Sequence, residues 1–135
     1  MIEGGRKNPG TVVEEKLSSL LLGSTPLRIH LIGVAGSGMS GIAALLLALG
    51  HRVGGSDRSD TVEVERLCRK GLVFTTPHRA DLVHDADLVI YSSAIHPGNP
   101  AYDAALVLGK RMARRAEVLA AVMQGKQGID RKSVV

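Results

Sequence analysis

A dense run of glycines lies between two apolar segments in the first third of the chain. Gly36, Gly38 and Gly41 have the spacing G-x-G-x-x-G, and Asp57 follows Gly36 by 21 residues. A turn of this kind exposes backbone N–H groups at the positive end of a helix, where a phosphate binds. An acidic side chain after the next strand accepts hydrogen bonds from a ribose. The chemistry indicated is binding of a nucleotide diphosphate.

The same turn fits a nicotinamide dinucleotide less well. In such a site the glycines begin where the strand ends, near Gly33, and there the chain reads Gly33-x-Ala35-x-x-Gly38. The longer loop favours phosphate binding without identifying the nucleotide. An NAD(P)-binding module of an oxidoreductase or regulator stays open, with Asp57 selecting NAD through the ribose. A domain without nucleotide affinity, kept for packing or dimerisation, is a third alternative.

A second polar segment follows another apolar run. Ser92 and Ser93 come directly after residues 88–91 and precede a loop rich in Pro and Gly. Ligands of open α/β sheets lie outside the carboxyl ends of the strands, so these hydroxyls can donate to the same anion, or else they cap local backbone. Of the five histidines, His78 is the best placed to reach a ligand, and the five together have no metal-ligand spacing.

The elements that position these residues alternate along the chain. Short apolar runs separated by helical patterns predict βαβ units. The fold class expected is α/β, a Rossmann-like parallel sheet of about five strands with helices on both faces. The expected strands are 28–32, 51–54, 72–74, 88–91 and 111–113, and the expected helices are 39–49, 61–70, 101–108 and 116–124.

Signals at the helix ends support this assignment. Asp60 with Glu63 resembles a capping box, and Asn99 before Pro100 predicts an N-cap followed by proline at the first helical position. On the helix at 61–70 we expect Cys68 to be a small buried side chain. Glycines that follow apolar helical runs predict left-handed stops, namely Gly50, Gly71, Gly109 and Gly125.

Composition limits the kind of protein. A chain of 135 residues with 44% apolar and 22% charged residues suits one globular domain. One cysteine excludes a disulfide framework and a Cys-rich zinc site. Two Tyr, one Phe and no Trp weaken any base-stacking role, so we expect no nucleic-acid partner. The net charge of +4 is spread along the chain and is typical of a mildly basic surface.

The first 27 residues are expected to be an extension with a short amphipathic helix at 11–22. The opening residues have no apolar core of a signal peptide, and no window approaches about 18 uninterrupted apolar residues. We therefore expect no membrane insertion and a cytoplasmic location. The oligomeric state is left open by the sequence.

Four motifs in order carry a specific resemblance. Over residues 28–128 the chain resembles the N-terminal domain of the Mur ligase family of peptidoglycan synthesis, and its L-alanine-adding members more than the murein peptide ligases. The motifs are His30 to Ala43, Gly55 to Asp57, Ser92 to Ile95 with Asn99-Pro100, and Arg114 to Glu117.

This resemblance implies a ligand and a set of contacts. The domain would bind the UDP part of UDP-N-acetylmuramic acid, with Asp57 near the uridine and no catalytic residue of its own. The diphosphate would lie on Gly36, Ser37, Gly38, Met39 and Ser40, and the other wall would consist of Ser92, Ser93, Ala94 and Ile95.

The resemblance also implies what lies outside this chain. In the family, ATP and Mg²⁺ convert the muramoyl carboxylate to an acyl phosphate, which the amine of L-alanine attacks, using a P-loop in a central domain and a C-terminal domain. Residues 129–135 form a tail where the P-loop run is expected, and no G-x-x-x-x-G-K-[ST] occurs. Because phosphoryl transfer needs such a lysine and Mg²⁺, we expect the chain alone to be catalytically incomplete.

Overall fold

The sheet has five parallel strands in the order β3-β2-β1-β4-β5. The computed structural model describes residues 17–36 and 38–134, the side chains of 126–134 excepted. The α/β class and the parallel sheet are confirmed, with β1 and β4 at the expected residues and the others starting one residue later. The strands are β1 (Arg28–Ile32), β2 (Arg52–Ser56), β3 (Val73–Thr75), β4 (Leu88–Tyr91) and β5 (Met112–Arg114).

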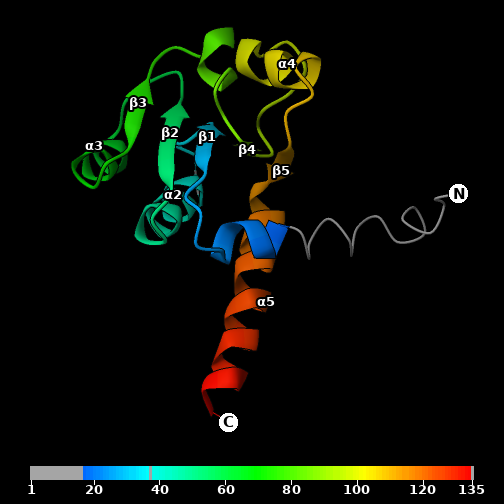
Figure 1. Ribbon diagram of the computed structural model, residues 1–135. Coiled ribbons are helices and arrows are strands. Elements are labelled where there is room, and N and C mark those ends of the chain that lie inside the picture. Colours follow the sequence, from blue (N-terminus) through cyan, green and yellow to red (C-terminus); the bar gives the residue numbers. More distant parts are fainter. Residues whose placement is uncertain (1–16, 37, 135) are drawn as a thin grey trace, which may run out of the picture.

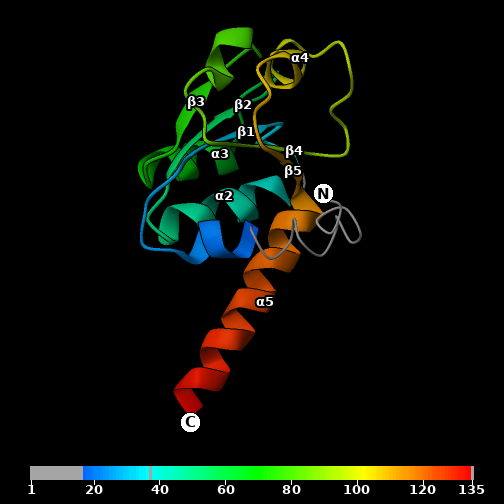
Figure 2. The ribbon, with the colours of Figure 1, turned by 45° about the vertical axis from the view of Figure 1, so that its right-hand side comes forward.

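Helices cover both faces of this sheet, as expected (Figures 1 and 2). One face carries α2 (Met39–Ala48), α3 (Val62–Arg69) and the first part of α5 (Arg115–Val134). The other face carries the 3-10 helix η2 (Ala80–Val83) and α4 (Pro100–Val107). No helix within 17–36 and 38–134 has the length and apolar character needed to cross a membrane.

Alternation along the strands divides the core into two clusters. In β1, Ile29 and Leu31 pack toward α2, whereas Ile32 packs toward η2 and α4. Successive side chains of a strand point to opposite faces, so a buried strand serves both. Tyr91 of β4 meets Tyr102 of α4 edge to face, with ring centroids 5.2 Å apart, and this contact fixes α4 on the sheet.

Of the four glycines predicted to end a helix, three do so and one does not. Gly50, Gly71 and Gly109 have φ of 96°, 114° and 67°, in the left-handed region. The stop at Gly125 was wrong, because α5 continues to Val134. A Cβ at Gly125 would collide with the side chain of Leu22. This glycine therefore permits close packing against the helical residues 17–22 and does not end a helix.

Of the two N-cap residues predicted from the sequence, one is confirmed and the other is wrong. Asn99 is the N-cap of α4, as expected, and its Oδ1 accepts from the N–H groups of Ala101 and Tyr102 at 2.9 and 3.2 Å. For α3 the expected cap was wrong by one residue. Thr61 is the N-cap, and its hydroxyl accepts from the Val64 N–H at 3.2 Å.

Cys68 was expected to be buried and is exposed. The α3 helix buries only Val64 and Leu67, because it is short and covers the sheet near its β3 edge with a narrow stripe. Cys68, four positions after Val64, lies at the margin of that stripe and remains accessible to solvent.

The residues before β1 join the main core. Residues 17–22 are helical, Leu17 and Leu21 are buried, and the rest of the helix expected at 11–22 lies outside the described residues. His51 holds this segment, since its Nδ1 accepts from the Leu27 N–H at 3.0 Å and its Nε2 donates to the Leu21 carbonyl at 2.8 Å. An amide N–H can only donate, so the proton of the neutral ring is on Nε2.

Candidate functional site

The glycine turn lies at the carboxyl edge of the sheet and is attached to the end of β2. The N–H groups of Gly33 and Val34 donate to the Ser56 carbonyl at 2.8 and 3.1 Å. The next N–H, that of Ala35, donates to Asp57 Oδ2 at 2.8 Å. Two of these three consecutive amides are therefore bonded to the last residue of β2 and the third to the residue after it, so the turn is held at the end of β2.

The amides further along the turn divide into two groups. Gly36 donates to the Gly33 carbonyl at 2.9 Å and Met39 to the Gly36 carbonyl at 3.0 Å, so these two shape the turn. The N–H groups of Gly38 and Ser40 have no partner among the described residues. Gly38 is the N-cap of α2 with φ of 80° and has no side-chain cap. The positive end of α2 is therefore open to an anion.

Arg115 lies against this helix end. A Cβ built on Gly38 would be 3.1 Å from Cδ and Nη1 of Arg115, and 3.2 Å from Cζ. Neither ion pair found among the described residues, Arg79–Asp81 or His84–Asp85, involves Arg115. A cation at a positive helix end is unfavourable by itself, and a bound anion would remove that cost.

Sequence reasoning included Arg115 in a family motif but gave it no role. The contact joins the first residue of α5 to the N-cap of α2, two positions far apart in the chain that the sheet brings together. No local spacing signals it.

Asp57 is held by the backbone. Its Oδ2 accepts from Ala35, as above, and its Oδ1 accepts from the Arg58 N–H at 2.7 Å. Each carboxylate oxygen keeps a further lone pair. The side chain is half-buried, so it both anchors the turn and offers acceptor positions to a ligand at the end of β2.

The segment after β4 forms a second side of the same site. A Cβ built on Gly33 would be 3.0 Å from Ser92 Oγ and 3.4 Å from Ile95 Cδ1, so these two side chains contact the glycine turn. Ser93 and Ala94 are exposed. Of the expected site residues, Ser37 lies outside the described part of the chain.

His78 belongs to a chain of three hydrogen-bonded side chains. Ser56 Oγ lies 2.8 Å from His78 Nδ1 and 3.0 Å from His30 Nε2. Ser56 is 0% exposed, His30 is 5% exposed, and His78 is half-buried. His30 and Ser56 were not expected at the site, because their meeting depends on the pairing of β1 with β2 and on the path of the chain after β3.

The burial of this chain keeps its rings neutral. Burial, with a smaller effect of the His78 charge, lowers the pKa of His30 to about 4. Burial also lowers the pKa of His78, while the Asp57 carboxylate opposes this shift and Arg58 adds to it. Within the described part of the chain, no three His, Cys, Asp or Glu side chains gather into a metal site.

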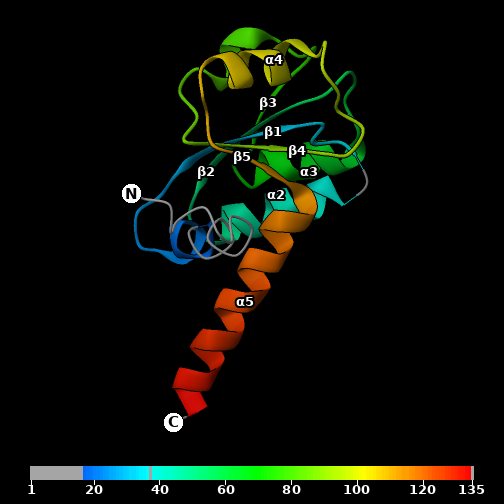
Figure 3. The same ribbon diagram turned by 90° about the vertical axis from the view of Figure 1, so that its right-hand side faces the viewer.

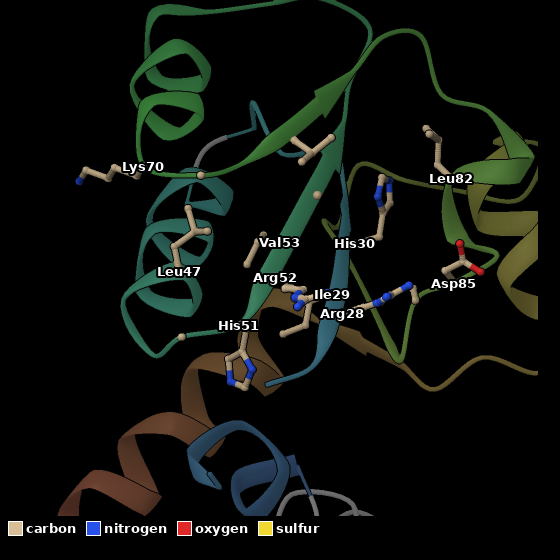
Figure 4. Close-up of a pocket in the computed structure, with 15 residues that line it drawn as sticks. Arg28, Ile29, His30, Leu47, His51, Arg52, Val53, Lys70, Leu82 and Asp85 are labelled. Carbon is tan, nitrogen blue, oxygen red and sulfur yellow. The ribbon is translucent and has the colours of Figure 1, made fainter. Parts of the chain in front are cut away.

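A hollow also lies at another part of the sheet. A shallow cavity of about 630 Å³ opens at the amino ends of β1 and β2 (Figure 4). Its lining includes Arg28, Arg52, Lys70 and Val73 and none of the glycine turn. Ligands of open parallel sheets lie at the opposite, carboxyl edge, so this hollow is not the candidate site.

Comparison with known proteins identifies the family. The description "Mur ligase family, catalytic domain" matches residues 28–127. The chain belongs to the Mur ligase family, and the relation inferred from the four motifs is confirmed.

Curated relatives in this family are named UDP-N-acetylmuramate–L-alanine ligases. It is 46% identical over 101 residues to the UDP-N-acetylmuramate–L-alanine ligase of Sinorhizobium fredii, covering 75% of this chain and 22% of the relative. It is 48% identical over 99 residues to that of Methylocella silvestris, covering 73% and 21%. The chain thus spans about a fifth of the length of these curated relatives.

Solved structures agree with this assignment. The UDP-N-acetylmuramate–alanine ligase of Thermotoga maritima has a TM-score of 0.69 at 30% identity, covering 73% of this chain and 23% of that one. A murein peptide ligase of Psychrobacter arcticus has a TM-score of 0.61 at 28% identity, covering 64% and 18%.

Proposed function

We propose that this chain binds UDP-N-acetylmuramate and is the nucleotide-sugar-binding domain of a ligase that adds L-alanine to that compound. The observation that carries the proposal is the N-terminus of α2, where the Gly38 and Ser40 amides have no partner among residues 17–36 and 38–134 and Arg115 brings a positive charge. The names of the relatives, UDP-N-acetylmuramate–L-alanine ligases, support the choice of ligand.

In this proposal the diphosphate occupies the glycine turn, on residues 36–40. The amides of Gly38 and Ser40 donate to its oxygens, and Arg115 neutralises part of its charge. Asp57 accepts from the ribose hydroxyls, since it lies one strand away from the turn. The segment from Ser92 to Ile95 closes the other side, with Ser92 as a hydroxyl donor and Ile95 as an apolar contact.

The proposed binding unit is residues 28–128, preceded by an extension of 27 residues and followed by a tail at 129–135. ATP and Mg²⁺ would act in the remaining part of a full-length ligase, because the sequence contains no G-x-x-x-x-G-K-[ST] run to hold the phosphates. The chain by itself is proposed to bind the nucleotide sugar without ligating alanine.

Isothermal titration calorimetry tests this function. UDP-N-acetylmuramate should bind the 135-residue chain with a stoichiometry of one, whereas ATP should give no heat. Absence of heat with millimolar UDP-N-acetylmuramate would contradict the proposal. Binding of NADH in its place, followed by fluorescence, would favour a dinucleotide module, and a stable oligomer without nucleotide affinity would favour an interaction domain.

A further inference from the structure

One face of the sheet is covered by helices only in part. On that face η2 and α4 pack in a cluster with Ile32 of β1 and Val89 of β4. Strands β2 and β3 lie beyond this cluster in the order of the sheet, and Val73 of β3 is 69% exposed. The hollow of about 630 Å³ lies over this less covered area, with η2 on one side and the edge strand β3 on the other.

Two arginines stand side by side at the amino end of the hollow. Arg28 of β1 and Arg52 of β2 are paired in register, are exposed, and both line the hollow. Neighbouring strands are about 4.8 Å apart, and like charges directly opposite each other destabilise a sheet. Neither guanidinium forms an ion pair with a residue in the described part of the chain. An anion held between the two would remove their repulsion.

A buried ring nitrogen faces the same hollow. His30 follows Arg28 by two residues in β1, so the two side chains lie on the same face of the sheet, and His30 lines the hollow (Figure 4). The ring is 5% exposed, and its Nε2 lies 3.0 Å from Ser56 Oγ. Its Nδ1 has no hydrogen-bond partner within 17–36 and 38–134. A buried polar atom without a partner is costly, so a ligand that reaches Nδ1 removes that cost.

Gly54 gives access to this nitrogen. It is paired in register with His30 on one side and with Val73 on the other. A Cβ at Gly54 would lie 3.5 Å from His30 Nδ1, so a side chain at this position would cover the nitrogen. The glycine therefore leaves a recess in the floor of the hollow, with an imidazole on one side of it and an exposed valine on the other.

The groups around the recess favour a phosphate monoester that carries an apolar group. Such a phosphate has three terminal oxygens and a charge of about −1.5 to −2 at pH 7, so it can accept from two guanidinium groups and an imidazole together. A carboxylate has two oxygens, and one guanidinium already satisfies both of them. Val73 and Leu82 of η2 line the hollow and offer apolar surface to the rest of the ligand.

Other charged side chains of the lining modify this preference. Asp85 is the one acidic residue of the lining, and it lies across the hollow from β2 (Figure 4). Its carboxylate is 3.8 Å from His84 Nδ1. Lys70 also belongs to the lining, but its ammonium group points away from the hollow (Figure 4). The positive charge available to an anion therefore comes from Arg28 and Arg52, and Asp85 opposes it.

We propose that this hollow is a second ligand site, in which Arg28, Arg52 and the Nδ1 of His30 hold a phosphate monoester with a small apolar group. The neutral His30 ring with its proton on Nδ1 donates to the phosphate, and Ser56 then donates to Nε2. The hollow opens at the amino ends of β1 and β2, and the glycine turn lies at their carboxyl ends. A five-residue strand is roughly 16 Å long, so both sites can be occupied at the same time.

Phenyl phosphate is the probe, titrated into the ¹⁵N-labelled 135-residue chain at pH 7.5 and followed by NMR. The Nε–H signals of Arg28 and Arg52 and the amide signals of Gly54 and Val73 should shift along one saturable curve. The His30 ring should move toward the tautomer with its proton on Nδ1. Benzoate has the same ring and two oxygens, and it should bind at least 5-fold more weakly. Equal affinities of the two probes would contradict the preference for phosphate.

Charge variants supply a second readout. Arg52→Gln should weaken the binding of phenyl phosphate by about 5- to 10-fold, the effect of one charge-assisted hydrogen bond at an exposed position. Arg66→Gln is the matched control, because Arg66 is an exposed arginine of α3 outside the lining, and its affinity should equal that of the parent protein. Asp85→Asn should strengthen binding by about 2- to 5-fold, because it removes the opposing carboxylate.

Gly54→Ala tests the access to His30. The added methyl group would make an ordinary contact at 3.5 Å with Nδ1, so the variant should fold. It should weaken the binding of phenyl phosphate at least 3-fold, because the methyl group lies between the ligand and the nitrogen. Gly41→Ala is the control, since its Cβ has nothing within 4 Å, and it should bind phenyl phosphate at the hollow as the parent protein does.

The outcomes separate this site from the proposed function. Shifts confined to residues 36–40 would overturn the second site and leave the nucleotide-sugar proposal intact. Shifts at the hollow in a chain that fails to bind UDP-N-acetylmuramate would support the second site and contradict the other proposal. An unchanged affinity in Arg52→Gln would overturn the role of the arginines. If that variant does not fold, the comparison of Asp85→Asn with the parent protein decides the question.

Discussion

Gly38 combines two requirements at a single residue. Its φ of 80° lies where a side chain is strained, and a Cβ would lie 3.1 Å from Arg115. Either effect alone would explain a glycine at this position. Gly38 therefore has the left-handed conformation needed at the N-cap of α2 and also leaves room for the Arg115 side chain.

We expect Gly38→Val to lower the affinity for UDP-N-acetylmuramate at least 10-fold, because the β-branched side chain displaces Arg115 and fills the space above the free amides. Calorimetry of the purified variant gives the result. Gly50→Val is the matched control, since its φ of 96° imposes similar strain with nothing within 4 Å and at the other end of α2. It should cost about 1–2 kcal/mol of stability and leave the affinity unchanged. Equal affinities of the two variants would refute the role of Gly38.

His30 makes stability depend on pH. Its pKa is about 4 in the folded chain and near 6.5 when unfolded, so the unfolded state binds more protons between these values. Stability is therefore full above pH 6.5 and falls as the pH drops toward 4, by up to roughly 3 kcal/mol. Half-buried His78, whose pKa is also lowered by burial, contributes in the same direction.

Urea unfolding at several pH values measures this effect. His30→Gln keeps a hydrogen-bonding group beside Ser56 and does not titrate, so its stability should depend less on pH over the same interval. A variant curve parallel to that of the parent protein would show that His30 is not the group responsible.

At the scale of elements, α5 and the helical residues 17–22 approach each other closely. Gly125 of α5 faces Leu22 and Ser18, and any larger residue there meets both. The segment is also held by the two hydrogen bonds of His51. The part of the chain before β1 is therefore packed onto the domain by side-chain contacts as well as by backbone bonds.

Gly125→Ala should destabilise the protein by about 1–3 kcal/mol, even though alanine is the better helix former, because the added methyl group overlaps Leu22. Gly41→Ala is the control. It lies in α2 with nothing within 4 Å of its Cβ, and it should be neutral or stabilising by up to about 1 kcal/mol. Thermal unfolding followed by circular dichroism compares the two, and a stabilised Gly125→Ala would show that the two helices are not in close contact.

Local signals predicted the elements well and the contacts between them less well. Gly50, Gly71 and Gly109 end helices because a left-handed residue is a property of a few neighbouring positions. Gly125 has the same local pattern, but its role is set by Leu22, about a hundred residues earlier in the chain. Cys68 was misjudged because the width of the buried stripe depends on how near α3 lies to the sheet edge.

The candidate site likewise has a part that the sequence could predict and a part that it could not. The glycine turn and its link to Asp57 could be predicted, since a strand, a turn and a helix follow one another directly. Arg115 and the His30–Ser56 contact could not, because each joins side chains from different strands or helices whose relative placement appears only when the sheet is assembled.

At the scale of the whole molecule, the domain presents its site at the carboxyl edge of the sheet, where α5 also begins, and the C-terminal end of α5 extends away from the sheet (Figure 3). A ligand that binds only the folded state stabilises it in proportion to the logarithm of its concentration. At about 100 times its Kd, UDP-N-acetylmuramate should add about 2.7 kcal/mol.

Differential scanning fluorimetry checks this expectation as a rise in Tm that grows with ligand concentration. At the same ligand concentration the rise should be about half as large or smaller in Gly38→Val and unchanged in Gly50→Val. An equal rise with N-acetylmuramate lacking the nucleotide would place the binding energy outside the glycine turn and contradict the proposed site.

The bonds from β2 to the turn, at Ser56 and Asp57, have a kinetic consequence. Because they involve groups of the protein alone, the receptor conformation exists before any encounter with ligand. Stopped-flow traces should then be single exponentials whose rate constant rises linearly with nucleotide concentration, without the plateau that a slow rearrangement would impose.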